Sequence, residues 1–185
     1  VRVARLTEGR GRLDPSFDGD GVAVYRLPDP LQPAVTRLSA DSTVTVGGAV
    51  YGGDGWPAFA LRFTESGEPD STFGGDGYVP FQTGAKQGMA ATAVDEFGAV
   101  VAAGFSVTGR KTSAPLVAGV LPDGSVDTGF GPNGRAVLPV GQGSAEAGPG
   151  IIVGGQFVVL VRSRVDGAKG TKSSYQLVRL VTPPT

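Results

Sequence analysis

The sequence predicts an all-β protein whose strands form a β-propeller-like array of four-stranded antiparallel blades. Three observations favour this fold. A motif recurs about every 57 residues along the 185-residue chain, and glycine and proline supply 31 and 14 of its residues. No window keeps the 3.6-residue apolar period of a capped helix. Because glycine and proline disfavour helix interiors, almost no helix is expected.

The internal repeat is carried by three residue types that keep the same spacing. Its phenylalanines lie 56 and 57 residues apart, and an aspartate and a glycine keep the same step. The recurring residues are Asp14, Phe17 and Gly21, then Asp70, Phe73 and Gly77, then Asp127, Phe130 and Gly134. The chain is therefore expected to be a single repeat domain, residues 1–185, with units at approximately 3–59, 60–116 and 117–175 and a partial unit at 176–185.

Each unit contains four short β-branched or small apolar runs bounded by glycine, proline and aspartate, which is the pattern of strands. The first run, such as Ala58–Phe63, leads through the Asp-x-x-Phe motif into the second. Second strands are expected at Val22–Tyr25, Tyr78–Phe81 and Ala136–Pro139, third strands at Ala34–Leu38, Met89–Val94 and Ile151–Val153, and fourth strands at Thr43–Gly48, Ala99–Gly104 and Phe157–Val161. Four strands in a unit of this length are typical of a propeller blade.

The motif is most complete in the third copy, at Leu121–Gly134. There the chain reads Asp-Gly-x-x-Asp-x-x-Phe-Gly-x-x-Gly from Asp123 onward, which resembles the bacterial delta-60 repeat family. That resemblance implies a propeller fold and carries no catalytic motif. The first copy departs from the family pattern, since Thr7–Arg12 is one residue longer and lacks the Asp-Gly pair.

The number of units raises a question of closure. Known propellers have at least four blades, whereas this chain holds three units and one further strand. We weigh three explanations: the chain is a piece of a longer repeat array, two copies associate to complete a ring of blades, or the three-fold repeat closes as a trefoil-like β barrel.

The repeated residues are expected to be structural. The turn glycines supply positive φ, the phenylalanines fill the space between neighbouring blades, and the aspartates accept hydrogen bonds from turn amides. The alternative role is a calcium loop made by Asp14, Asp18 and Asp20. Because the second and third copies keep fewer carboxylates, no metal and no cofactor are expected.

Catalytic chemistry is limited by composition. The chain has no histidine and no cysteine, and its formal net charge is -1, which also argues against nucleic-acid binding through bulk charge. Paired carboxylates are the remaining catalytic option, and the candidates are Asp54, Asp95, Glu96, Glu146 and Asp166. Each lies in a turn-like or glycine-rich stretch, so no catalytic residue is predicted. No run of about 18 apolar residues is present, so no membrane span is expected.

A binding face is predicted from the loops that vary most between copies, at 51–57, 106–113 and 162–173. If the units are equivalent, these loops share one face. The candidate ligand-binding residues on it are Tyr51, Trp56, Arg110, Lys111, Arg162, Arg164, Lys169 and Lys172. Aromatic and basic side chains together favour a protein or carbohydrate partner.

The sequence therefore indicates a non-enzymatic repeat module that binds a protein or glycan partner through loops on one face. The family resemblance and the lack of cysteine fit an extracellular or cell-envelope protein of a bacterium. Two other interpretations stay open, namely a fragment of a larger propeller glycosidase or lyase and a structural spacer.

Overall fold

The protein consists of β-strands joined by turns, as the sequence predicts. The structure, a computed structural model, describes residues 1–9, 11–27, 35–38, 42–49, 58–81, 87–110, 112–139, 143–154, 156–167 and 170–180. Within these ranges there is no α-helix, and the helical residues are two 3-10 turns, Thr128–Phe130 and Pro132–Gly134. The all-β prediction is confirmed.

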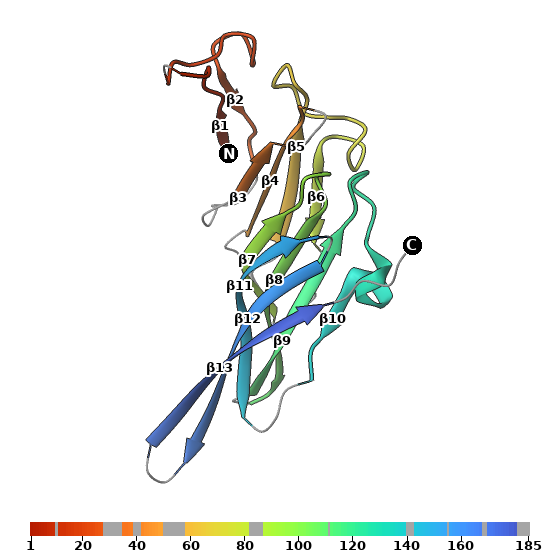
Figure 1. Ribbon diagram of the computed structural model, residues 1–185. Coiled ribbons are helices and arrows are strands. Elements are labelled where there is room, and N and C mark those ends of the chain that lie inside the picture. Colours follow the sequence, from red (N-terminus) through yellow and green to blue (C-terminus); the bar gives the residue numbers. More distant parts are fainter. Residues whose placement is uncertain are drawn as a thin grey trace.

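The described residues form thirteen strands in four separate antiparallel sheets (Figure 1). The first sheet pairs β1 (Arg2–Ala4) with β2 (Val22–Val24). The second contains β3 (Val35–Leu38), β4 (Val44–Ala49), β5 (Ala58–Phe63) and β6 (Tyr78–Phe81), and the third contains β7 (Gln87–Val94), β8 (Val100–Gly109), β9 (Thr112–Val120) and β10 (Arg135–Val137). The fourth contains β11 (Ser144–Val153), β12 (Gln156–Gly167) and β13 (Gly170–Leu180). Consecutive strands are neighbours in every sheet, so each sheet is a meander.

The sheets do not coincide with the sequence repeats. The second sheet joins the last two strands of the first copy, β3 and β4, to the first two strands of the second copy, β5 and β6. The third sheet joins copies two and three in the same way. We expected three four-stranded sheets and one extra strand, whereas the described residues form sheets of two, four, four and three strands. No sheet among them closes, so they do not form the trefoil-like barrel that was the alternative.

The sheets stack one upon the next through three apolar clusters. Val3, Phe17 and Ala23 of the first copy pack against β4 and β5. One face of the second sheet, with Phe73, packs against Val100 and Ala102 of β8. The other face of β8, with Val101 and Ala103, packs against β11 and β12. Because successive side chains of a strand point to opposite faces, β8 contributes to two clusters at once.

The hairpins are longer than the sequence indicated. The sequence predicts loops at residues 106–113 and 162–173. Instead, β8 continues to Gly109 and β9 begins at Thr112, while β12 continues to Gly167 and β13 begins at Gly170. Each pair in these stretches apart from the closing Gly167–Gly170 pair and the Arg162–Tyr175 pair includes a valine, serine or threonine, and the β-branched residues among them fit a pleated surface. The β12–β13 hairpin extends beyond β11, whose first residue, Ser144, pairs with Arg164 (Figure 1).

Candidate functional site

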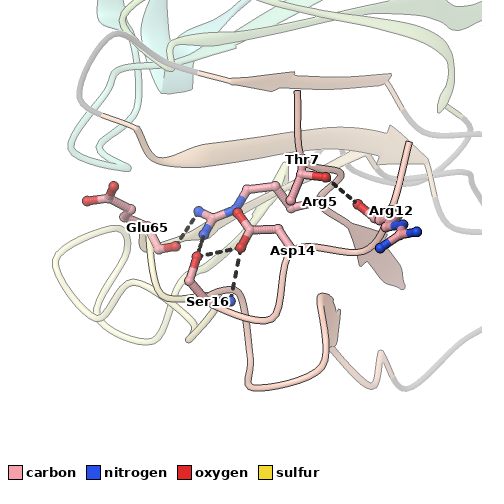
Figure 2. A network of polar contacts seen from close by, with 6 residues as sticks. All are labelled: Arg5, Thr7, Arg12, Asp14, Ser16 and Glu65. Atoms are coloured by element: carbon pink, nitrogen blue, oxygen red, sulfur yellow. Dashed lines mark hydrogen bonds and ion pairs between the residues drawn. The ribbon is translucent and has the colours of Figure 1, made fainter. Parts of the chain in front are cut away.

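The Asp-x-x-Phe turn of the first copy is held by an arginine (Figure 2). Arg5 Nε lies 2.9 Å from Asp14 Oδ2, and Arg5 Nη2 donates to Ser16 Oγ at 2.6 Å. Asp14 Oδ1 accepts from the amide and the hydroxyl of Ser16 at 3.0 and 2.7 Å. Arg5 Nη1 donates to the carbonyl oxygen of Glu65, in the next copy, at 2.5 Å. One side chain therefore fixes its own turn and links it to the following copy.

The second copy repeats this arrangement with more burial. Arg62 Nε lies 2.7 Å from Asp70 Oδ2, and Arg62 Nη2 donates to Thr72 Oγ1 at 2.9 Å. Arg62 Nη1 donates to the carbonyl of Pro122 in the third copy. The two side chains of this ion pair are each 10 % exposed. We call this arrangement the arginine latch. It consists of the arginine, the aspartate that it pairs with, the hydroxyl residue two positions after that aspartate, and the carbonyl group that the arginine reaches in the next copy.

Each latched turn also makes a backbone contact with the next copy. Asp18 N donates to the carbonyl of Ser66 at 2.7 Å, and Gly74 N donates to the carbonyl of Asp123 at 3.3 Å. The guanidinium carbon of the latch arginine stands 4.9 Å from the centroid of the repeat phenylalanine, Phe17 or Phe73. The latch thus covers the phenylalanine that lies between two sheets.

The third copy lacks the latch, because Gly119 stands where the first two copies have arginine. Asp127 Oδ1 accepts from Gly129 N at 2.9 Å, as in an Asx turn. A Cβ atom on Gly119 would lie 2.5 Å from the Phe130 ring, so the ring occupies the space that arginine fills elsewhere.

The latch changes the ionisation of its carboxylates. The hydrogen bonds from Ser16, together with the charge of Arg5, lower the pKa of Asp14. Burial raises the pKa of Asp70, but the hydrogen bonds from Thr72 and the charge of Arg62 outweigh it, so the pKa lies below its ordinary value of 3.8. These carboxylates are ionised at neutral pH, and a protonated general acid is not found among them.

The repeat glycines occupy positions that a side chain would strain. Gly21 and Gly77 have φ of 89° and 83°. A Cβ atom on Gly77 would lie 3.0 Å from Asp70 N and 3.1 Å from Arg62 O. The turn therefore requires glycine both for its φ and for the close approach of the latch backbone.

The calcium alternative receives no support from the described residues. Asp14 is in the latch, Asp20 Oδ1 accepts from Val22 N at 2.8 Å, and Asp18 lies in the left-handed region with φ of 51°. Within the described ranges no three His, Cys, Asp or Glu side chains gather where they could hold a metal ion.

The candidate catalytic carboxylates lie in separate turns and hairpins. Asp95 Oδ1 accepts from Phe97 N and Ala99 N at 2.9 and 2.8 Å, Asp166 Oδ1 accepts from Thr171 Oγ1 at 2.7 Å, and Glu146 forms an ion pair with Arg162. Glu96 is exposed in the Asp95 turn, and Asp54 lies outside the described residues. Each partnered carboxylate thus has a local structural role.

The predicted binding face is described only in part. Tyr51, Trp56, Lys111 and Lys169 lie outside the described residues. Arg110, at the β8–β9 turn, is exposed, as are Arg164 and Lys172 on the β12–β13 hairpin. Both hairpins point toward the same end of the molecule in Figure 1. Arg162, also predicted to bind ligand, is paired with Glu146 instead.

The latch arginines are the residues that sequence reasoning missed. Arg5 and Arg62 lie 57 residues apart, within one residue of the 56 that separate Phe17 from Phe73. An arginine that keeps the repeat spacing is unlike a solvated surface residue, whose position is free to vary. That spacing was the signal that could have found them.

Comparisons with known proteins show little. No model of a protein family and no curated protein sequence matches the chain. Among solved structures, a similar chain is an endo-1,4-beta-xylanase from Bacteroides thetaiotaomicron VPI-5482, with 10 % sequence identity and a TM-score of 0.38. The similarity covers 84 % of this chain and 62 % of the xylanase, so this chain spans less than two thirds of that protein. Among the described residues no helix has the length and apolar character needed to cross a membrane.

Proposed function

We propose that this chain is a non-catalytic repeat module of a bacterial secreted or surface protein, built from propeller-like blades, and that its hairpins bind an acidic protein or glycan partner. The observation that carries the proposal is the regular stacking of meander sheets, with the Asp-x-x-Phe turns of the first two copies hydrogen-bonded to the copy that follows. In such an arrangement the core is shared by all copies and function belongs to the loops at one end.

The roles of the carboxylates support a non-catalytic module. A glycosidase needs one protonated and one ionised carboxyl group on either side of a sugar bond. Here Asp14 and Asp70 are latch residues with lowered pKa values, and Asp95, Glu146 and Asp166 hold turns or hairpins. A single carboxylate substitution that abolished turnover of a polysaccharide, with folding intact, would overturn this part of the proposal.

The β12–β13 hairpin supports the binding role. Its tip extends beyond the sheet and leaves Arg164 and Lys172 exposed. Glu146 pairs with Arg162, whereas Arg164 and Lys172, on the half of the hairpin nearer its turn, stay exposed to an acidic partner. Such a contact is expected to weaken as salt rises.

The test is a binding assay with alginate and heparin as acidic probes and dextran as the neutral probe. The double variant Arg164→Glu/Lys172→Glu is expected to bind the acidic probes at least about tenfold more weakly than the unaltered protein, because charge pairs across an interface steer and hold the partner. The matched control is Arg12→Glu/Arg26→Glu, which makes the same change of charge on exposed residues of the first copy.

Each outcome is informative. Loss of binding confined to the hairpin variant supports the hairpin as the binding site. Equal loss in the control variant would show attraction by net charge alone. No binding to acidic or neutral glycans, and no specific protein partner, would favour a structural spacer.

A further inference from the structure

The outer face of the fourth sheet carries apolar side chains that the described part of the chain leaves exposed. Its inner face packs on the third sheet through Phe157, Val159 and Val161. On the outer face Ile151 of β11 and Tyr175 and Leu177 of β13 are 61, 62 and 75 % exposed. Val158 and Leu160 of β12 lie between these strands, because Ile151 pairs with Val158 and Leu177 pairs with Leu160. Contiguous exposed apolar side chains of this kind commonly mark an interaction site.

The repeat positions indicate what covers this face. Leu177 lies opposite Leu160 in the fourth sheet, as Val117 lies opposite Ala103 in the third. Val117 and Ala103 are both 0 % exposed, because the fourth sheet covers them. The exposed face of the fourth sheet is therefore made by residues at the same repeat positions as the face of the third sheet that the fourth sheet covers.

The other end of the stack presents the complementary half. In the second copy Phe63 follows the latch arginine and is buried against the preceding copy, in the cluster with Val3 and Phe17. Val120 holds the same position in the third copy and is buried in the cluster with Ala58 and Phe73. In the first copy this position is Leu6, which is 56 % exposed.

The polar part of the interface is also repeated. Arg179 lies opposite Val158, as Arg62 lies opposite Thr45, so Arg179 has the latch position on β13. Arg179 is exposed. Each latch arginine donates to the carbonyl of a tight turn in the next copy. The turn that Arg5 reaches is closed by a bond from Thr64 N to Glu68 O at 2.8 Å, and the turn that Arg62 reaches is closed by a bond from Leu121 N to Ser125 O at 2.9 Å. The first copy has the matching turn, closed by Thr7 N and Arg12 O at 2.8 Å.

We propose that the chain associates head to tail, with the outer face of β11–β13 covering the Leu6 side of the first sheet of a second copy. Leu177 and Leu160 then pack near Leu6, and Arg179 donates to the Thr7–Arg12 turn. The contact reproduces the three internal sheet contacts. It is heterologous, since different surfaces meet, and it buries two apolar ends at once. It does not depend on the binding role of the hairpins.

The experiment compares two variants that each block one end. Leu177→Asp blocks the β13 face and Leu6→Asp blocks the first-sheet face, and both positions are exposed, so each variant is expected to fold. Phe97→Asp is the matched control, because Phe97 is 66 % exposed in a turn outside both faces. Mass is measured by light scattering after size exclusion over a roughly hundredfold range of concentration, because association follows mass action.

The unaltered protein and Phe97→Asp are expected to give masses above the 18.7 kDa of one chain that rise with concentration or settle at a closed ring. Each end variant alone is expected to be a monomer. An equal mixture of the two is expected to recover a dimer, because Leu177 of one and Leu6 of the other still provide one intact contact.

Two results would overturn the proposal. The first is an unaltered protein that stays monomeric at every concentration. The second is assembly that Leu177→Asp abolishes and Leu6→Asp leaves unchanged, which would mean that two identical β13 faces meet. Thermal unfolding of each variant checks that loss of assembly does not come from loss of folding.

Discussion

The second and third copies solve the same packing problem in different ways. In the second copy Arg62 covers Phe73, pairs with Asp70 and reaches the carbonyl of Pro122. In the third copy Gly119 replaces the arginine and the ring of Phe130 moves into the vacant space. Phe73 is completely buried, whereas Phe130 stays 7 % exposed. Within one molecule, successive sheets are therefore joined by the arginine latch in one place and by the ring of Phe130 in another.

The two solutions differ in the turn that they allow. The latched turn places Gly74 and Gly75 at φ of 63° and 95°. The turn of the third copy winds into two short 3-10 helices, with Pro132 at the start of the second and Asn133 at φ of 59°. Without an arginine, the aspartate holds only its own turn, so this turn contributes to the contact with the fourth sheet through the apolar Phe130 ring. The comparison predicts that the second copy is bound more firmly to its neighbours than the third.

The largest expected effect comes from removing the buried ring. Phe73→Ala is expected to lower the free energy of unfolding by about 4 kcal/mol, because it loses apolar burial and leaves a cavity under the latch. Phe130→Ala is expected to cost about 3 kcal/mol, since Phe130 is slightly less buried than Phe73, at 7 % exposed. Urea unfolding measures both. If Phe130→Ala lost as much unfolding free energy as Phe73→Ala, or more, the second copy would not be the more firmly bound of the two.

Breaking the latch is the next largest effect. Arg62→Ala leaves Asp70 buried without its charged partner, and removing one member of a buried ion pair is expected to cost about 3 kcal/mol. Arg5→Ala is the matched control and is expected to cost less, because its ion pair is more exposed and is screened by solvent. The measurement is the free energy of unfolding of both variants. A larger loss for Arg5→Ala would show that burial does not decide the strength of the latch.

Much of this architecture was predictable from the sequence. Repeat spacing predicted the turns, and β-branched runs bounded by glycine predicted strands near β4, β5, β6 and β8. These signals are local, because strand propensity and turn chemistry depend on neighbouring residues. The grouping of strands into sheets depends on partners far apart in the chain. The repeat unit has no marked beginning, so pairing β4 with β5, across the boundary of two copies, could not be read from the spacing.

The candidate site was less predictable. Arg5 and Arg62 keep the repeat spacing, but an arginine in a strand is commonly a solvated side chain, and its carbonyl partner has no sequence signature. Arg162 was predicted to bind ligand because it is basic, yet Glu146 lies opposite it across β11 and β12. Cross-strand register decides such pairs, and the length of β11 was not evident from glycine-rich Ser144–Gly150.

A smaller effect is expected from filling the space at Gly119. Gly119→Ala is expected to destabilise the protein by about 1–2 kcal/mol, because the new Cβ would lie 2.5 Å from the Phe130 ring and overpacking forces neighbours to shift. The control is Gly119→Ala combined with Phe130→Leu, in which the smaller side chain makes room. Simple additivity predicts that the double variant loses as much stability as Gly119→Ala and Phe130→Leu lose together. If the double variant is no more stable than this prediction, the ring and the glycine are not coupled.

The smallest effect is confined to acid pH and separates the latched carboxylate from an ordinary one. The pKa of Asp70 is lower in the folded protein than its ordinary value of 3.8. As pH falls, the unfolded chain therefore binds this proton first. The stabilisation from the charged latch is complete above about pH 4 and is lost as pH falls through the lower folded pKa. Urea unfolding between pH 6 and pH 2 is expected to show a steeper loss of stability below pH 4 in the unaltered protein than in Asp70→Asn. If stability falls with pH in parallel in the two proteins, Arg62 does not stabilise Asp70 as a charged partner. The arginine latch would then contribute no more than the hydrogen bonds of an ordinary Asx turn.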